Sequence, residues 1–185
     1  MIIAVIGKKY SGKTTFSSYI DKSGSFVSFA FADPIKKICK ETFSLTDDQL
    51  HDPILKETLD PRWNKTPREL FQIVGTDLFR ERFDKDIWVN VVRHQVNRVD
   101  PEKNIIFTDI RFQNELDFIV SLNRSEPVVV VEIRRPHDHR SPMDTHSSET
   151  VELEYPYKMF LDNDGTLEEF YEKINQFKVE KLKMF

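Results

Sequence analysis

The stretch that decides the fold is Gly-Lys-Lys-Tyr-Ser-Gly-Lys-Thr at residues 7–14. It follows the apolar run at residues 1–6 and precedes a helix-like stretch, which is the setting of a G-x-x-x-x-G-K-[ST] phosphate-binding loop. Two glycines let the backbone curl until its N–H groups converge on an anion, and the helix adds its positive end. Lys13 supplies a cation for the outer phosphates, and Thr14 a hydroxyl for Mg²⁺. The loop predicts nucleoside triphosphate binding through Gly7, Lys9, Ser11, Gly12, Lys13, Thr14 and Thr15.

Composition limits the kinds of partner this chain can have. The 185 residues suffice for one domain with its own core, and 39% hydrophobic with 31% charged residues is typical of a globular protein. The formal net charge of −4 argues against binding of nucleic acid polymers or anionic membranes. Cys39 is the single cysteine, so we expect no internal disulfide and a cytoplasmic location. We expect neither a membrane span nor a signal peptide, because the first apolar run leads directly into the loop.

Five apolar segments predict the strands of one parallel sheet. They are continuous rather than alternating, which indicates burial on both faces, and helical patterns separate most of them. A helix near residues 166–178 ends the chain. The predicted strands are residues 2–6, 25–32, 104–108, 128–133 and 159–161.

Two long excursions leave this predicted sheet. The connection at residues 33–103 is too long for one crossover helix, and it reads as helices at 34–43, 66–82 and 86–98 with a proline-rich loop at 51–67. We interpret it as an inserted helical lobe over the carboxyl edge of the sheet, where ligands bind in such folds. The second excursion follows the fourth strand and reads as a short cover. The predicted boundaries are a core at 1–32, 100–134 and 158–185, a lobe at 33–99, and a lid at 135–157.

Asp109 follows the predicted third strand, where phosphate-loop proteins place a carboxylate for Mg²⁺. The alternative is that Asp109 caps the helix that begins near Phe112. Arg111 would project over the same edge and could grip a phosphate with two hydrogen bonds. An ion pair of Arg111 with Asp109 or Glu115 is the alternative for this residue. The sequence therefore predicts Thr14 and Asp109 as the metal ligands.

The two excursions carry further basic residues. Arg68 opens a helix, and a helix start and a guanidinium both favour a phosphate group. Gly75-Thr76 interrupts the same helix, which predicts a close backbone approach to a ligand or to another helix. In the lid, Arg134, Arg135 and Arg140 form the densest positive cluster, suited either to charge stabilisation during phosphoryl transfer or to a solvated basic face.

The motifs resemble those of the deoxynucleoside monophosphate kinases of phages and other viruses. The matching pieces cover most of the chain. Besides residues 7–14, they are Phe-Ala-Asp-Pro-Ile-Lys at 31–36, Lys-Glu at 56–57, Pro-Arg-Glu-Leu at 67–70 leading to Gln72 and Gly-Thr at 75–76, Thr-Asp-Ile-Arg-Phe-Gln-Asn-Glu at 108–115, His-Ser-Ser-Glu at 146–149, and Asn-Asp-Gly-Thr at 163–166.

The resemblance implies a three-layer α/β P-loop NTPase fold with a five-stranded parallel sheet, an acceptor-binding lobe and an arginine-bearing lid. It implies transfer of the γ-phosphoryl group of ATP, with Mg²⁺, to a deoxynucleoside 5′-monophosphate. It places Lys13, Arg111, Arg135 and Arg140 in catalysis, with Arg134 as an alternative lid arginine. By the same resemblance, Asn163 and Gly165 lie near the donor adenine, and the acceptor residues are Asp33, Lys36, Arg68, Gln72, Gly75, Thr76 and Arg111.

Two other readings stay open at this point. One is a small-molecule kinase of the same architecture, with an acceptor like that of phosphomevalonate kinase or dephospho-coenzyme A kinase. The other is a nucleotide-dependent switch, although the chain has no guanine-specifying Asn-Lys-x-Asp run. The partners expected in all of these cases are small nucleotides or other phosphorylated small molecules, and a homodimer is compatible with the phenylalanine-rich composition.

Overall fold

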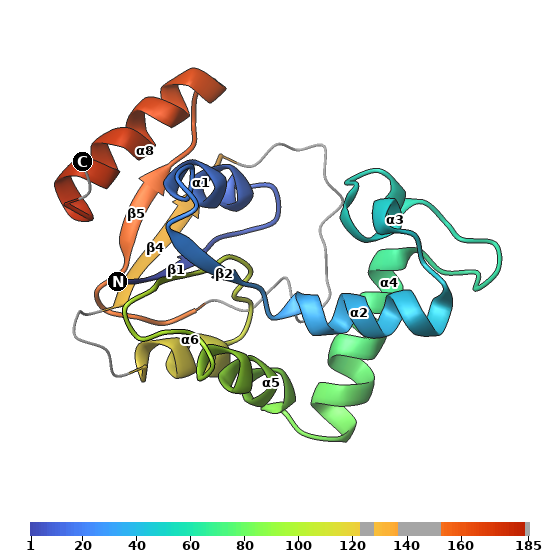
Figure 1. Ribbon diagram of the computed structural model, residues 1–185. Coiled ribbons are helices and arrows are strands. Elements are labelled where there is room, and N and C mark those ends of the chain that lie inside the picture. Colours follow the sequence, from blue (N-terminus) through green and yellow to red (C-terminus); the bar gives the residue numbers. More distant parts are fainter. Residues whose placement is uncertain (123–127, 137–152, 184–185) are drawn as a thin grey trace. The chain divides into compact units, whose positions relative to one another are not determined.

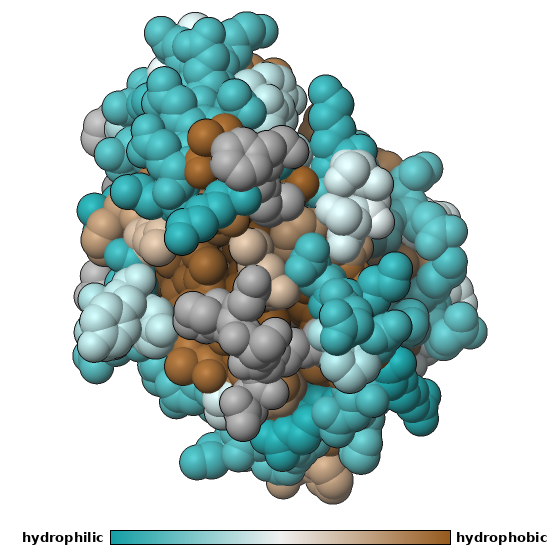
Figure 2. Space-filling model, turned by 60° about the vertical axis from the view of Figure 1, so that its left-hand side comes forward, coloured by the Kyte–Doolittle hydropathy of each residue, from teal (hydrophilic) through white to brown (hydrophobic). Residues whose placement is uncertain are grey.

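The computed structural model describes residues 1–122, 128–136 and 153–183, which divide into two compact units. The sheet unit consists of Met1–Ala30 and Val99–Phe185, and the helical unit consists of Phe31–Arg98. Among the described helices, none has both the length and the apolar character that crossing a bilayer requires. The face of the molecule drawn in Figure 2 is mostly hydrophilic, in keeping with the high content of charged residues.

The sheet unit contains five parallel strands in the order β2-β3-β1-β4-β5. This confirms the predicted five-stranded parallel sheet. The first strand has the predicted bounds, and the third, fourth and fifth differ from the prediction by one residue at their carboxyl ends. The strands are β1 (Ile2–Ile6), β2 (Phe26–Phe29), β3 (Asn104–Phe107), β4 (Val128–Arg134) and β5 (Met159–Asp162).

Helices cover both faces of this sheet, giving the three layers expected from the sequence. Figure 1 shows α1 (Lys13–Ile20) and α8 (Leu167–Lys181) on one face and α6 (Gln113–Val120) on the other. The core under α1 and α8 includes Phe16 and Phe177, whose rings pack edge to face with their centres 5.8 Å apart. All five residues of β1 are buried, because this central strand has a neighbour on each side and a helical layer on each face.

The helical unit is built from short helices. They are α2 (Ala32–Phe43), α3 (Asp47–His51), the 3₁₀ turn η1 (Leu55–Glu57), α4 (Pro67–Gln72), the π-helix η2 (Ile73–Arg80) and α5 (Ile87–Val96). The start of α4 is as predicted: the Thr66 hydroxyl accepts a hydrogen bond from the Glu69 N–H at 3.1 Å, and Glu69 Oε2 accepts from the Thr66 N–H at 2.7 Å.

Two local expectations were wrong. The second strand ends at Phe29 rather than at residue 32, because Ala32 already begins α2, whose second and third positions hold an acid and a proline that suit a helix start. The single helix expected at 66–82 changes to a π-helix at Ile73. No element was predicted for residues 44–50, where α3 begins behind a capping box formed by Thr46 and Gln49.

Cys39 lies in the core of the helical unit with Leu70 and Val74, and its side chain is fully buried. Burial raises the pKa of the Cys39 thiol to about 12, because it disfavours the charged thiolate. We predict that the folded chain reacts with a thiol-specific disulfide reagent at pH 8 on the order of a hundredfold or more slowly than the unfolded chain. Rapid modification of one thiol in the native protein would contradict this placement.

Candidate functional site

The phosphate loop connects β1 to α1 through backbone conformations that glycine favours. Gly7 has φ +143° and Gly12 has φ +107°. A Cβ atom on Gly7 would lie 2.5 Å from the Ile133 carbonyl oxygen in the neighbouring strand β4. Position 7 therefore has no room for a side chain, and β4 fixes the path of the backbone into the loop.

Two side chains within the loop suit a bound anion. The Lys13 ammonium donates to the carbonyl oxygens of Gly7 at 2.8 Å and Lys8 at 2.7 Å, so the lysine folds back over the loop. The Ser11 hydroxyl is buried, and in the described part of the chain it has no hydrogen-bond partner. An unpaired buried hydroxyl costs free energy that a ligand oxygen would recover. The loop thus offers both a cation and an unused donor to a phosphate group.

The carboxyl end of β4 holds two consecutive arginines that contact different groups. A guanidinium nitrogen of Arg135, Nη1, donates to the carbonyl oxygen of Tyr10 in the phosphate loop at 3.5 Å. The Arg134 guanidinium lies 3.5 Å above the Phe160 ring centre, and its Nε is 3.3 Å from Glu132 Oε1. Of the arginines predicted for the lid, Arg135 is therefore the one with a described contact to the phosphate loop. The third candidate, Arg140, lies outside the described residues.

Glu132 and Lys158, which were missed from sequence, form a polar cluster with Arg134. Lys158 Nζ lies 3.0 Å from Glu132 Oε2. Burial alone would raise the pKa of Glu132, but hydrogen bonds and charge from Lys158 and Arg134 hold that pKa below its usual value. The carboxylate stays ionised at neutral pH and holds both cations. A charged residue inside an otherwise apolar strand was the signal that could have identified it.

The β3–α6 connection carries the predicted carboxylate and arginine. Asp109 is two residues past the end of β3, which pairs directly with β1, so Asp109 and the phosphate loop both follow the carboxyl ends of adjacent strands. The buried Glu115 Oε2 accepts from the backbone N–H groups of Arg111 at 2.8 Å and Phe112 at 3.2 Å. Glu115, the third residue of α6, therefore caps the N-terminus of this helix.

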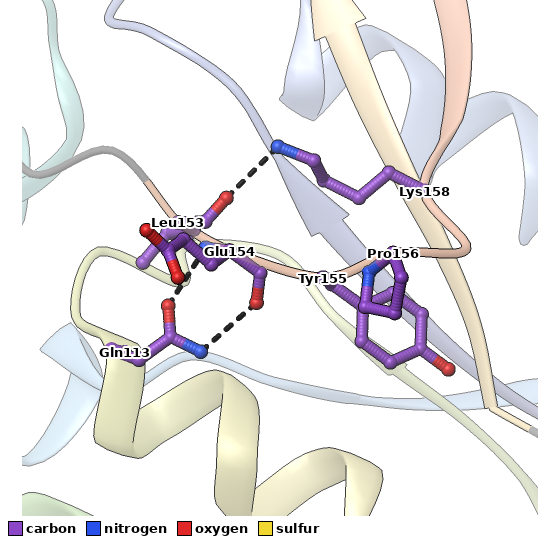
Figure 3. Close-up of a pocket in the computed structure, with 6 residues that line it drawn as sticks. All are labelled: Gln113, Leu153, Glu154, Tyr155, Pro156 and Lys158. Carbon is purple, nitrogen blue, oxygen red and sulfur yellow. Dashed lines mark hydrogen bonds between the residues drawn. The ribbon is translucent and has the colours of Figure 1, made fainter.

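Beside this connection, Gln113 at the start of α6 binds the described carboxyl-terminal part of the predicted lid (Figure 3). Its side-chain amide donates to the Glu154 carbonyl at 3.1 Å and accepts from the Glu154 N–H at 2.8 Å. Lys158 donates to the Leu153 carbonyl at 2.8 Å. These residues, with Tyr155 and Pro156, line an open hollow of about 670 Å³ to which the phosphate loop contributes no side chain. The hollow is a secondary feature of the sheet unit.

The helical unit holds the predicted acceptor residues other than Arg111, and among them Arg68 pairs closely with a carboxylate. Its Nε donates to Glu57 Oε1 at 2.6 Å, and its side chain is mostly buried. Lys36 Nζ and Asp33 Oδ1 lie 3.9 Å apart on the first turn of α2, and Gln72 ends α4. Glu57, also missed as a site residue, fixes the orientation of the Arg68 guanidinium.

Gly75 makes the close backbone approach that its position in a helix predicted. A Cβ atom there would lie 2.7 Å from Ile35 Cδ1 of α2, and the Gly75 carbonyl accepts from the Trp88 indole N–H at 2.7 Å. The neighbouring Thr76 is buried. Of the two possibilities left open by the sequence, the contact that the structure shows is with another helix.

The sheet order, the phosphate loop after β1 and the carboxylate after β3 together define a P-loop NTPase fold. This chain belongs to the deoxynucleotide monophosphate kinase family, whose sequence profile matches residues 1–60 and 54–174. A protein of Acanthamoeba polyphaga mimivirus, provisionally named a deoxynucleotide monophosphate kinase, is 40% identical over an alignment of 188 positions that covers 94% of this chain and 94% of that one. The deoxynucleoside-5′-monophosphate kinase of Escherichia phage T5 is 34% identical over 58 residues, 31% of this chain and 23% of that one.

Solved structures with low sequence identity share the fold. TT1252 from Thermus thermophilus has a TM-score of 0.51 at 17% identity, with 98% of this chain and 97% of that chain covered. The dephospho-CoA kinase from Campylobacter jejuni has a TM-score of 0.50 at 17% identity, with 99% and 98% covered. At this identity the likeness supports the P-loop architecture alone.

The close contact at Gly7 predicts that alanine substitutions at two glycines with positive φ, Gly7 and Gly24, destabilise the protein to different extents. Gly24 has φ +66° and nothing within 4 Å of an added Cβ, so Gly24→Ala should cost about 1 kcal/mol of unfolding free energy from backbone strain. Gly7→Ala should cost about 2 kcal/mol more, since its methyl group would meet the Ile133 carbonyl. Urea unfolding measures both variants. ATP binding should be lost in Gly7→Ala and kept in Gly24→Ala, and equal behaviour of the two would refute the crowding argument.

Proposed function

We propose that this chain transfers the γ-phosphoryl group of ATP to the 5′-phosphate of a deoxynucleoside monophosphate. An acceptor phosphate oxygen forms the new bond to the γ-phosphorus, the bond from that phosphorus to the β-bridging oxygen breaks, and ADP leaves with the electron pair. The acceptor oxygen is already anionic, so no strong base is required. The observation that carries the proposal is the phosphate loop of a chain of this family, with its folded-back Lys13 and a Ser11 hydroxyl that has no hydrogen-bond partner among the described residues.

We assign the donor phosphates to the loop. Its backbone N–H groups, the positive end of α1 and the Lys13 ammonium all favour the negative charge of the β- and γ-phosphates. The residues assigned to this role are Gly7, Lys9, Ser11, Gly12, Lys13, Thr14 and Thr15. In the turn between β5 and α8, we assign Asn163 and Gly165 to the adenine end of the donor.

Mg²⁺ is the metal that this donor set fits. Mg²⁺ in kinases is bound by one or two protein oxygens together with phosphates and water, rather than by a full protein cage. No group of three or more metal-binding His, Cys, Asp or Glu side chains occurs within the described residues. Thr14, in the first turn of α1, and Asp109, after the neighbouring strand β3, would hold the ion, which neutralises phosphate charge when bound.

We assign the acceptor phosphate to Arg68 and Arg111, and the acceptor sugar and base to Asp33, Lys36, Gln72, Gly75 and Thr76. The contact with Glu57 supports the role of Arg68, because it pins Nε and so sets the plane of the guanidinium. Packing against Ile35 explains Gly75 without a ligand, so a substrate contact at this position is the least supported of the set.

Arg135 is the arginine we assign to charge stabilisation during transfer. Its contact with Tyr10 places the guanidinium beside the loop that holds the γ-phosphate, whereas Glu132 and Phe160 hold Arg134 elsewhere. Arg140 is a second lid candidate. The proposed partners are small nucleotides and not nucleic acid polymers or membranes. A homodimer is compatible with the proposal, as is action in the cytoplasm of a host cell.

An acceptor panel tests the activity directly. With γ-labelled ATP and Mg²⁺, label should move to at least one deoxynucleoside monophosphate and appear as its diphosphate. Phosphomevalonate and dephospho-coenzyme A should accept none. Label transfer only to one of these two compounds would establish the other kinase class, and slow phosphate release that no acceptor accelerates would indicate a nucleotide switch.

Two arginine variants distinguish a specific role in acceptor binding from the general effect of removing one positive charge. Arg68→Ala should raise the acceptor KM about 10- to 100-fold, because charge-assisted hydrogen bonds to phosphate contribute about 1.5–3 kcal/mol, and should leave the KM for ATP nearly unchanged. Arg82→Ala, which removes an exposed arginine of the same unit, is the control and should leave both KM values unchanged. Steady-state kinetics with each substrate varied provides the measurement. A selective loss of ATP affinity in Arg68→Ala would contradict the acceptor assignment.

A further inference from the structure

Asn163 contacts the phosphate loop from a position 152 residues away in the chain. It directly follows β5, and it is only 7% exposed. Its side-chain amide, Nδ2, donates to the Ser11 carbonyl oxygen at 2.9 Å, and its backbone N–H donates to the Arg134 carbonyl oxygen at 2.7 Å. The backbone contact attaches the turn to the end of β4, so the amide is presented to the loop from a fixed base.

The hydrogen bond to Ser11 determines which way one loop peptide points. A trans peptide is planar, so its C=O and N–H groups point in opposite directions. With the Ser11 carbonyl directed at Asn163, the N–H of Gly12 is directed away from Asn163. Phosphate loops bind anions through such N–H groups. The amide of Asn163 thus sets the direction of one of the donors available to the triphosphate.

Gly12 makes this peptide easy to rotate. A glycine occupies left-handed and right-handed backbone regions about equally well, so the loop itself opposes rotation of the Ser11–Gly12 peptide only weakly. A rotated peptide would present a carbonyl oxygen where an N–H group had been, and a carbonyl repels phosphate. Asn163 and Phe170 also pack against Gly12, since an added Cβ atom would lie 2.6 Å from Asn163 Nδ2 and 3.1 Å from Phe170 Cε1.

We infer that Asn163 is a positioning residue for the donor phosphates: its amide locks the Ser11–Gly12 peptide in the orientation that binds anions. This deepens the proposed function and rests on it. It differs from a contact with the adenine base, because the group recognised through Asn163 is the polyphosphate and the effect passes through the loop backbone.

Binding of inorganic tripolyphosphate, which has no base, distinguishes the two roles. Titration calorimetry of Asn163→Ala should show about tenfold weaker binding of both ATP and tripolyphosphate, the loss expected for one hydrogen bond that orients a charged contact. The ratio of the two dissociation constants should stay as in the unaltered protein. A loss confined to ATP would overturn the inference in favour of a base contact, and unchanged binding of both would overturn it outright.

Two further variants separate positioning from loss of structure. Phe177→Leu loosens the packing of α8 against Phe16 without touching Asn163, and it should bind tripolyphosphate normally even if its thermal unfolding midpoint falls. An equal loss of tripolyphosphate binding in Phe177→Leu would contradict a specific role for the amide. Asn163→Asp keeps the size of the side chain but replaces the donor with an acceptor, so it should bind at least as weakly as Asn163→Ala. Normal binding by Asn163→Asp would contradict the lock.

These titrations also keep the inference distinct from the proposed function. If the unaltered protein binds ATP and tripolyphosphate but transfers no phosphoryl group to any deoxynucleotide, the acceptor assignment fails. The effect of Asn163 on phosphate binding can still be measured in that case. If the unaltered protein transfers phosphoryl groups and Asn163→Ala binds tripolyphosphate normally, the lock fails and the kinase assignment stands.

Discussion

The structure depends on the close approach of the Gly7 backbone to the Ile133 carbonyl of β4. A parallel sheet brings the carboxyl ends of β1 and β4 side by side, and only a glycine fits where the chain turns out of β1. From that point the loop curls to the start of α1, and the residues around it complete the site. Asn163 holds the Ser11 carbonyl, and Arg135 reaches the Tyr10 carbonyl. Both contacts bind a carbonyl oxygen, and in the Ser11–Gly12 peptide this directs the Gly12 N–H away from Asn163. The Ser11 N–H, opposite the Tyr10 carbonyl, donates to the Lys8 carbonyl at 3.2 Å and so shapes the loop itself.

Arg134 and Arg135, at the end of β4, are neighbours in the sequence but make different contacts. Side chains alternate between the faces of a strand, so Arg134 shares a face with Glu132 and Phe160, while Arg135 follows the strand end toward the loop. Lys158 and Arg134 keep Glu132 ionised, and Glu132 pairs with both cations. Pairing with Glu132 therefore distinguishes Arg134 from Arg135, whose described contact is with the loop.

Much of the fold could be predicted from local sequence, because the signals are local. The apolar run of β1, the glycine spacing of the loop and the capping box before α4 each act within a few residues. The site was predicted less completely. The pairing of Asn163 with Ser11 joins residues 152 apart, and Glu57 reaches Arg68 only after the helical unit has folded. The sequence predicted a close approach at Gly75, but neither its partner Ile35 nor the change from α-helix to π-helix at Ile73 follows from a pattern of residue types.

The central claim is that one chain binds the donor triphosphate with its loop and the acceptor phosphate with arginines, so that one phosphoryl group passes between them. Its most direct test is calorimetric titration with adenosine and a deoxynucleoside joined through a chain of five phosphates. The account predicts one site per chain, affinity well above that of ATP or of the monophosphate alone, and a loss of that gain in both Lys13→Ala and Arg68→Ala. Binding no tighter than ATP, and insensitive to Arg68→Ala, would contradict it.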